Sequence, residues 1–175
     1  MKLVLPSVTY KESFIQAVKE YHSIDAKDRK DIYSLNIDEL QTDFSSYVKQ
    51  LQERAEGKNL PEEYVPDTTY WLIDNGEFIG RVSLRHTLTE SLLKEGGHVG
   101  YDIRPSKRNK GYGKRILELA LQKAKEQGIH KVLVTCDETN IASKKIIEAN
   151  GGIFENAIEV KEGKPKKLRY WIKIS

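Results

Sequence analysis

The sequence predicts a mixed α/β (α+β) domain in which helices flank a mostly antiparallel central sheet. Segments with a single apolar stripe at helical spacing fill the first third of the chain. Short runs rich in aromatic and β-branched residues follow, and a hairpin signal joins two of them. Strand-like and helix-like segments then alternate to the end, as expected for helices packed on a sheet.

The N-terminal part predicts two amphipathic helices and a loop. Apolar side chains recur at helical spacing over residues 10–21 and again over residues 40–51, so each segment presents one face to a core. The stretch EGKNLPEEYVPD contains Gly57, Pro61 and Pro66, which interrupt regular structure. We therefore expect a helical part and a loop over residues 1–66.

The next three elements are predicted strands. TTYWLID and EFIGRVSLRH are separated by an Asn75-Gly76 pair, which is a strong signal for a tight hairpin. GGHVGYDIR forms a third run, and the alternation of a strand places His98 and Asp102 on one face and Tyr101 on the other.

Two helices and two strands complete the prediction. Residues 112–127 carry one apolar face and are followed by Gly128, a common helix terminator. HKVLVTC is typical of a buried strand, residues 140–150 of a second helix ended by glycines, and LRYWIKI of a last strand. The basic stretch KEGKPKK has two interpretations, an RNA contact or a solvated hairpin, and its Lys164-Pro165 pair favours the hairpin.

Length and composition favour one domain over residues 1–175, with the sheet and core in residues 67–175. The formal net charge of +3 is too small to indicate a nucleic-acid partner. The single cysteine, Cys136, excludes an internal disulfide and fits a reducing compartment. The N-terminal apolar run is broken by Pro6, and no segment approaches the roughly 20 apolar residues of a membrane helix. We therefore expect a cytoplasmic protein with no membrane partner.

A basic junction with two glycines links the third strand to the helix that begins at residue 112. IRPSKRNKGYGKRIL fails as a P-loop, because Gly113-Lys114 is followed by Arg115. It also fails as a dinucleotide fingerprint, because Ile116 stands where the third glycine is required. Backbone N–H groups of glycines at a helix N-terminus bind anions. The residues alone leave two interpretations, an anion site or an ordinary basic connection.

The segment RNKGYG, residues 108–113, resembles the R/Q-x-x-G-x-G/A signature of the GCN5-related N-acetyltransferases, the GNAT superfamily. The strand GYDIRP before it, the helix after it and the later segment TCDETNIASKKIIEANGG resemble that family's elements in the same order. The resemblance extends from Thr69 to about Phe154. It implies a GNAT-like fold with a βαβα unit that binds acetyl-coenzyme A. No metal site is expected, because His22, His86 and His130 lack metal-ligand spacing with any cysteine or second histidine.

The resemblance also implies the residues that contact the cosubstrate. Backbone N–H groups of the loop would bind the pyrophosphate with basic side chains nearby, and the preceding strand would pair with the pantetheine arm. Asn140 would contact that arm, although an asparagine before a helix also serves as an N-cap. The expected cofactor-binding residues are Tyr101, Asp102, Ile103, Arg108, Asn109, Lys110, Gly111, Tyr112, Gly113, Lys114, Asn140 and Ser143.

The positions that carry proton donors and acceptors in many relatives are changed here. The family often has a tyrosine seven residues after the asparagine and a base five residues before it, and these positions hold Ile147 and Thr135. We expect Tyr101 either to donate to the leaving thiolate or to pack in the core.

The expected general base is His98, because an imidazole with a pKa near about 6.5 can deprotonate an ammonium group through water. Its alternative is a structural histidine at the start of a strand. Glu90, Glu95 and Asp102 are further candidates for the base.

Two functions remain open at this stage. The first is an N-acetyltransferase that moves an acetyl group directly to a primary amine of a small molecule or peptide in a ternary complex. The second is an acyl-coenzyme A-binding or sensing module with degenerate catalysis. Acidic residues such as Asp38, Glu39, Glu62 and Glu63 would attract a cationic acceptor. We expect Cys136 to be a buried thiol. A second copy of the chain is a candidate partner, in a homodimer.

Overall fold

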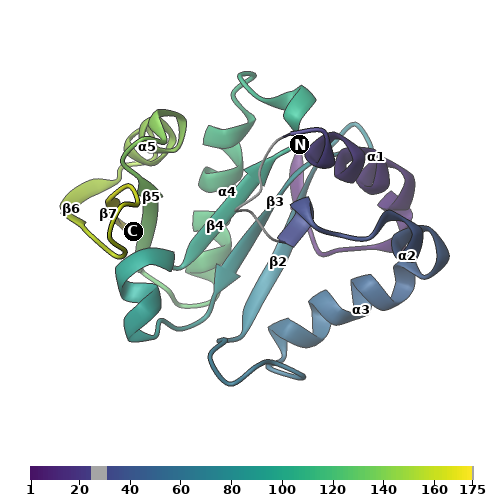
Figure 1. Ribbon diagram of the computed structural model, residues 1–175, viewed down its shortest axis with the longest axis horizontal. Helices are drawn as coiled ribbons and strands as arrows, with labels where there is room; N and C mark the ends of the chain where they lie inside the picture. The colour runs from purple at the N-terminus through teal and green to yellow at the C-terminus, as the bar shows by residue number, and fades with distance from the viewer. Residues whose placement is uncertain (25–30, 175) are drawn as a thin grey trace.

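The computed structural model describes residues 1–24 and 31–174 and confirms a mixed α/β fold with antiparallel sheets flanked by helices (Figure 1). The strands are β1 Lys2–Val4, β2 Asp67–Asp74, β3 Glu77–Arg85, β4 Val99–Ile103, β5 Lys131–Asp137, β6 Ile153–Ile158 and β7 Lys167–Lys173. The α-helices are α1 Lys11–His22, α2 Ile37–Thr42, α3 Phe44–Ala55, α4 Tyr112–Glu126 and α5 Ile141–Glu148. Single helical turns are η1 Val8–Tyr10, η2 Asp31–Tyr33, η3 Leu92–Gly96 and η4 Pro105–Lys107.

The strands form two sheets rather than the single sheet expected. One has the order β1-β2-β3-β4 and the other the order β5-β7-β6, and every pair of neighbours is antiparallel. β4 and β5 are therefore edge strands, one from each sheet. The predicted hairpin between β2 and β3 is confirmed, and both of its turn residues, Asn75 and Gly76, have positive φ, as a type I′ turn requires.

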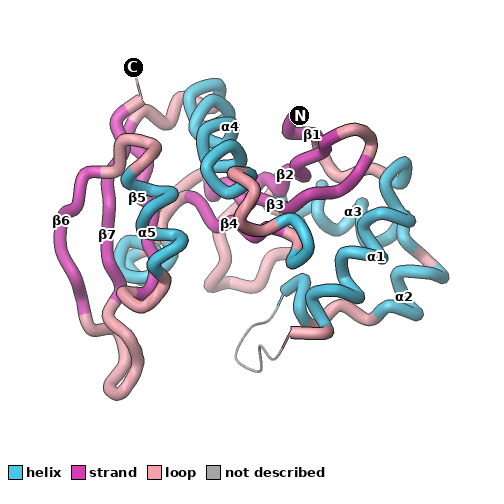
Figure 2. Tube along the Cα trace, turned by 90° about the horizontal axis from the view of Figure 1, so that it is seen from above, coloured by secondary structure: helices cyan, strands magenta, loops and turns pink. Residues whose placement is uncertain are grey.

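Two apolar cores lie on opposite faces of the first sheet. Trp71 and Phe78 pack with Phe14 of α1 and Phe44 of α3 on one face. On the other face, α4 covers both sheets and buries residues of each in one continuous cluster (Figure 2). The side chains of α4 that face this cluster are Ile116, Leu117, Ala120 and Ala124, the stripe expected from the sequence.

The segment expected to form one helix over residues 40–51 is divided at Asp43. This residue has φ −139° and ψ 69°, and its carboxylate accepts a hydrogen bond from the Ser46 backbone N–H. Asp43 therefore ends α2 and caps α3, which is a common role for aspartate at a helix start. Among the described residues, no helix is long and apolar enough to cross a membrane.

Candidate active site

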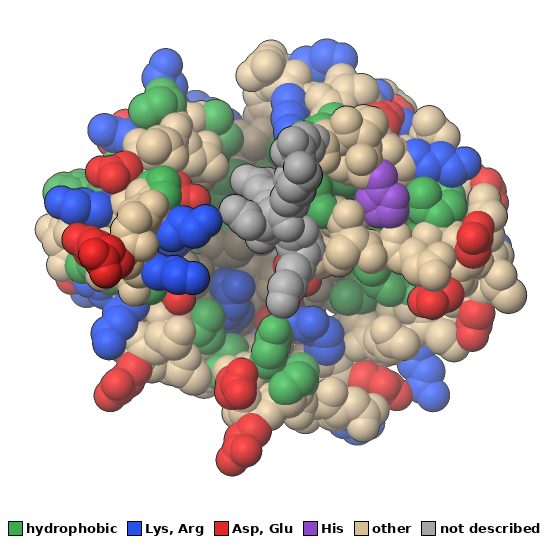
Figure 3. Space-filling view, in the orientation of Figure 1, with side chains coloured by type: hydrophobic (Ala, Val, Ile, Leu, Met, Phe, Trp, Pro, Cys, Tyr) green, Lys and Arg blue, Asp and Glu red, His purple; other side chains and the backbone are tan. Residues whose placement is uncertain are grey.

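The edge of β4 that faces β5 is open along most of its length. At the two ends of the β3–β4 ladder, Arg85 N donates to His98 O (2.8 Å) and Arg104 N donates to Ile79 O (2.9 Å). The alternation of an antiparallel ladder then directs the backbone groups of Val99, Tyr101 and Ile103 away from β3. Figure 3 shows the surface hollowed between the side of the molecule that carries β5–β7 and the side that carries β2–β4.

This register corrects one expectation. The backbone amide of Asp102 lies opposite Arg81 and is directed toward β3, so it is not available to a pantetheine arm. The amides of Tyr101 and Ile103 do face the open edge. The Asp102 side chain instead lies on the face of the sheet that carries α1, where its carboxylate accepts a hydrogen bond from the Tyr33 hydroxyl (3.0 Å).

His98 joins the two sheets where β4 begins. Its backbone N–H donates to Leu133 O (2.8 Å), and its ring Nδ1 accepts from the buried Leu133 N–H (2.9 Å). Nδ1 can accept only when it carries no proton, so the neutral ring has its hydrogen on Nε2. Burial, and then the nearby Arg85 guanidinium, lowers the pKa of His98, which supports that neutral form. The geometry favours the structural alternative that the sequence left open for His98.

Tyr101 and Ser143 connect β4 to α5 across the open edge. Their hydroxyl oxygens are 2.9 Å apart, and the Cys136 thiol is a second hydrogen-bond partner of Ser143. Burial raises the pKa of Tyr101 to about 12, so its hydroxyl stays protonated at neutral pH. Asn140 caps α5 by accepting from Ser143 N (3.0 Å), as one interpretation of the sequence predicted. Tyr101, Asn140 and Ser143 are thus brought together.

The six basic side chains of the strand-to-helix junction divide into two groups. Three are paired with carboxylates: Arg104 with Glu20 and Glu77, Lys107 with Glu77, and Arg115 with Glu118. The other three are Arg108, Lys110 and Lys114, which are exposed and, within residues 1–24 and 31–174, form no ion pair. These three are the residues that the family resemblance placed near the phosphates.

The first turn of α4 presents backbone donors without a side-chain cap. Gly111 occupies the N-cap position with φ 83°, and no side chain of the described residues bonds to the N–H groups that follow it. These N–H groups have no acceptor inside the helix and carry the positive end of its dipole. Donors and unpaired cations at one helix terminus suit a diphosphate.

Two residues of the RNKGYG segment have packing roles instead. A Cβ on Gly113 would lie 2.5 Å from Ile146 Cδ1 of α5, so the missing side chain lets α4 and α5 approach each other. The Tyr112 hydroxyl donates to Asp74 Oδ2 (3.0 Å) and ties α4 to the hairpin. Arg108 also has an internal role, because its Nε donates to Ile103 O (3.0 Å) at the open edge of β4.

A half-exposed polar surface lies on the opposite face of β3 and β4 from α4. We call it the polar strip; it consists of Arg81, Ser83, Arg85, Gly100 and Asp102. Sequence reasoning missed this strip, although alternating polar residues in EFIGRVSLRH gave a signal for it. Its residues are only partly buried, unlike Trp71 and Phe78 of the apolar cluster on the same face.

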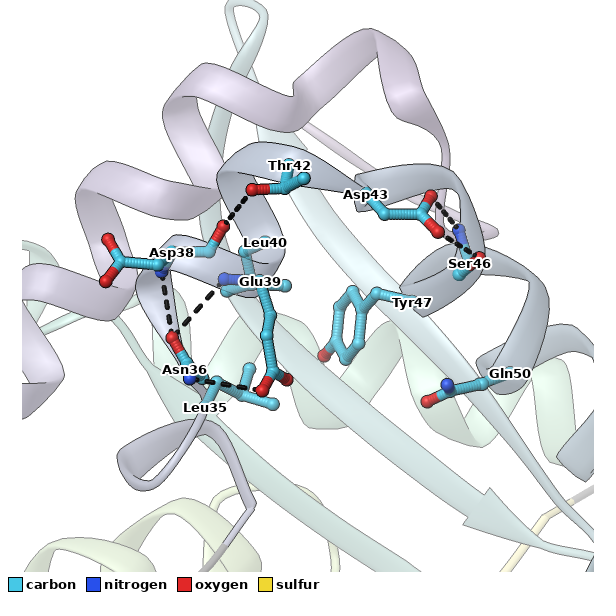
Figure 4. Close-up of a pocket in the computed structure, with 10 residues that line it drawn as sticks. All are labelled: Leu35, Asn36, Asp38, Glu39, Leu40, Thr42, Asp43, Ser46, Tyr47 and Gln50. Atoms are coloured by element: carbon cyan, nitrogen blue, oxygen red, sulfur yellow. Dashed lines mark hydrogen bonds between the residues drawn. The ribbon is translucent and has the colours of Figure 1, made fainter.

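A pocket of about 500 Å³ lies between α2 and α3 (Figure 4). Asp38, Glu39 and Asp43 are among its lining residues, and Tyr47 extends into it. Asn36 Oδ1 accepts from the N–H groups of Asp38 and Glu39, and Asp43 caps α3, so its acidic character follows from local helix starts. Glu62 and Glu63 are exposed and do not line this pocket.

The comparisons with known proteins decide the family. Residues 21–153 match the family model described as Acetyltransferase (GNAT) domain. The chain belongs to the GNAT acetyltransferase family. The protein is therefore an acetyl-coenzyme A-dependent acetyltransferase, and the start of α4, with three cations that form no ion pair among the described residues, fits the diphosphate of that cosubstrate. In the part of the chain that the structure describes, no cluster of His, Cys, Asp or Glu is placed to hold a metal ion.

Solved GNAT structures share the fold. The microcin self-immunity acetyltransferase MccE, in complex with acetyl-CoA and AMP, is similar with a TM-score of 0.70 and 16% identity over 98% of this chain and 91% of that one. RimL, a ribosomal-protein α-N-acetyltransferase in complex with coenzyme A, is similar with a TM-score of 0.66 and 17% identity over 98% of this chain and 93% of that one. An acetyltransferase from Salmonella typhimurium that modifies an N-terminal serine of a ribosomal protein has a TM-score of 0.66 and 16% identity over 99% of this chain and 94% of that one. None of the curated proteins matches this chain.

Proposed function

We propose that this GNAT acetyltransferase transfers the acetyl group of acetyl-coenzyme A to a primary amine of a small molecule or peptide, with both substrates bound at once. The observation that carries the proposal is the open edge of β4, which lies between two chemically different surfaces. The uncapped, basic start of α4 follows the C-terminal end of β4. The polar strip lies on the face of β3 and β4 that is opposite α4. A cosubstrate at that edge and an acceptor on the strip would meet at Tyr101.

The proposed cosubstrate contacts are of two kinds. Backbone N–H groups from Asn109 to Lys114, with the side chains of Arg108, Lys110 and Lys114, bind the phosphates. The backbone of Tyr101 and Ile103 and the side chains of Asn140 and Ser143 bind the pantetheine arm along the open edge. In this arrangement the Tyr112 side chain contacts Asp74 of the hairpin, and Gly113 packs against Ile146 of α5.

The chemical step is an attack of the neutral amine on the thioester carbonyl carbon. The carbonyl oxygen gains negative charge, and outward-facing backbone N–H groups of β4 stabilise it. The C–S bond then breaks, and the protonated Tyr101 hydroxyl, held by Ser143, donates a hydrogen bond to the leaving thiolate.

The attacking nitrogen must lose a proton. The sequence predicted His98 as the acceptor, but its Nδ1 is engaged by Leu133 and its Nε2 carries a hydrogen. Among the predicted candidates, Asp102 presents its carboxylate on the polar strip. We propose that Asp102 takes up the proton, directly or through a water, while His98 holds the two sheets together.

The test is release of the coenzyme A thiol when acetyl-coenzyme A is supplied with a panel of amines. Because a solved neighbour modifies an N-terminal serine, peptides with a free α-amine belong in the panel beside small amines. We expect thiol release that depends on the amine, with one acetyl group gained for each thiol. Tight binding of acetyl-coenzyme A without turnover on any amine would support the sensing alternative, which the Ile147 position suggests.

A further inference from the structure

Arg85 is a half-buried cation that forms no ion pair within residues 1–24 and 31–174. Its Nη1 donates to Gly96 O (3.1 Å) and Gly97 O (2.9 Å), both uncharged carbonyl groups. In that part of the chain no carboxylate lies within ion-pair distance of its guanidinium, whereas Arg81 and Arg54 are both paired. Arg81 binds Asp31 (3.1 Å) and Arg54 binds Asp67 (2.8 Å).

The surroundings of Arg85 make this charge costly. Burial is the main cause that lowers the pKa of its guanidinium, and the charge of Asp67 opposes that shift. Asp67 already accepts two hydrogen bonds from Arg54 and one from Ser83. A partly buried charge usually has a charged partner, whereas the partners of Arg85 among the described residues are carbonyl oxygens.

The second terminal nitrogen of Arg85 lies over β4. A Cβ on Gly100 would be 4.0 Å from Arg85 Nη2 and would meet no other atom within that distance. The glycine therefore leaves the guanidinium edge accessible above the strand. Gly100 directly precedes Tyr101, and successive strand residues are about 3.3 Å apart, so an anion on Arg85 would lie a few bonds from the proposed reaction centre.

We propose that Arg85 binds an anionic oxygen group of the acceptor, a carboxylate or a phosphate. The acceptors are then amines that carry such a group within a few bonds of the reacting nitrogen. This inference rests on the proposed function, because it requires the acceptor to lie on the polar strip. A guanidinium suits both groups, since its planar donors match two oxygens at once.

Matched acceptor pairs provide the test. β-Alanine and β-alaninamide differ by a carboxylate, and phosphoethanolamine and ethanolamine differ by a phosphate. We expect the wild-type enzyme to show a higher kcat/KM for the anionic member of at least one pair. Arg85→Gln should lower that value about tenfold to a hundredfold, the range for a lost charge-assisted hydrogen bond, and leave the neutral member unchanged. Taking the ratio within each pair cancels differences in folding and amounts of active enzyme.

Two further variants control the experiment. Arg85→Lys keeps the charge without the planar fork and should retain part of the preference. Arg115→Gln removes an exposed arginine paired with Glu118 on α4 and should leave the preference unchanged. If Arg85→Gln does not fold, the kcat/KM ratios of the wild-type enzyme and of Arg85→Lys within each acceptor pair still test the role of Arg85.

The outcomes separate the inference from the function on which it rests. Equal or faster transfer to the neutral members by the wild-type enzyme would overturn the role of Arg85 and leave the acetyltransferase proposal intact. A preference for the anionic acceptor that persists in Arg85→Gln would also overturn the role of Arg85 and leave the acetyltransferase proposal intact. If the enzyme acetylates no amine at all, the proposed function fails, and the inference fails with it.

Discussion

Replacing His98 tests whether the link between the two sheets depends on one ring nitrogen. In His98→Asn, the side-chain oxygen occupies nearly the position of Nδ1 and can accept from Leu133 N–H, whereas His98→Ala offers no acceptor. The Leu133 N–H is fully buried, and leaving such a donor unpaired costs about 1–3 kcal/mol. For a chain of this length, each kcal/mol corresponds to about 2–4 °C in Tm, so His98→Ala should lower Tm by about 2–12 °C relative to His98→Asn.

The same hydrogen bond predicts a pH dependence. Burial and Arg85 lower the pKa of His98 in the folded protein, while in the unfolded chain it is near about 6.5. The folded state therefore binds fewer protons than the unfolded state as the pH falls through this range. The stability from His98 should be fully present above pH about 6.5 and decline below it, toward the folded pKa. Asn does not titrate, so the Asn variant should lack this decline.

Thermal unfolding followed by circular dichroism between pH 5 and 8 measures both effects, and initial rates with a fixed amine measure catalysis. We expect His98→Asn to keep kcat within a few-fold of the wild type. The structural account would be refuted if His98→Ala melted at the wild-type temperature. It would also be refuted if His98→Asn lost about 10²-fold in kcat with coenzyme A binding intact, which is the signature of a lost general base.

Three further predictions follow from contacts at the open edge and in α4. Gly113→Ala should change stability by less than about 1 kcal/mol, because Ile146 Cδ1 is the end of a flexible side chain that can move away and alanine has the higher helix propensity; a larger loss in denaturant titrations would show that Ile146 cannot move. Tyr101→Phe should lower kcat, and Ser143→Ala should lower it less. The coenzyme A Kd from calorimetry should be nearly unchanged in Tyr101→Phe. Equal rates for the wild type and both variants would show that the Tyr101 hydroxyl takes no part in the mechanism. Cys136→Ala should retain most activity with intersecting initial-rate lines, because direct transfer needs no acyl-enzyme, and parallel lines with an acetylated Cys136 would disprove direct transfer.

Local patterns predicted most of the elements of this fold. The β2–β3 hairpin depends on the Asn75-Gly76 pair, and the apolar stripe of α4 depends on helical spacing, so both could be found from neighbouring residues. The division at Asp43 was missed because the apolar spacing continues across it. A helix cap depends on which backbone N–H groups the carboxylate reaches, and Asp43 is equally compatible with an exposed position in a longer helix.

The division of the sheet was beyond such reasoning. β4 and β5 do not pair along their length, and the contact that links them is between His98 and Leu133, 35 residues later, through a hydrogen bond between a ring nitrogen and a backbone amide. Neither residue type predicts that partner, and a histidine at the start of a strand is equally compatible with catalysis. The contact of Gly113 was equally hidden, because its close neighbour, Ile146 Cδ1, comes from another helix.

The polar strip shows why the acceptor side is harder to find than the cosubstrate side. In the proposed function, a continuous segment binds the phosphates of acetyl-coenzyme A, so their site would appear in the sequence as a motif. The strip takes Arg85 from β3 and Gly100 and Asp102 from β4, and these residues become neighbours only when the two strands pair in the observed register. A shift of one residue would turn Arg85 toward the core that α4 covers. That Arg85 forms no ion pair within residues 1–24 and 31–174 can be seen only in the folded chain, and this observation, rather than any motif, underlies the proposal of an anionic acceptor.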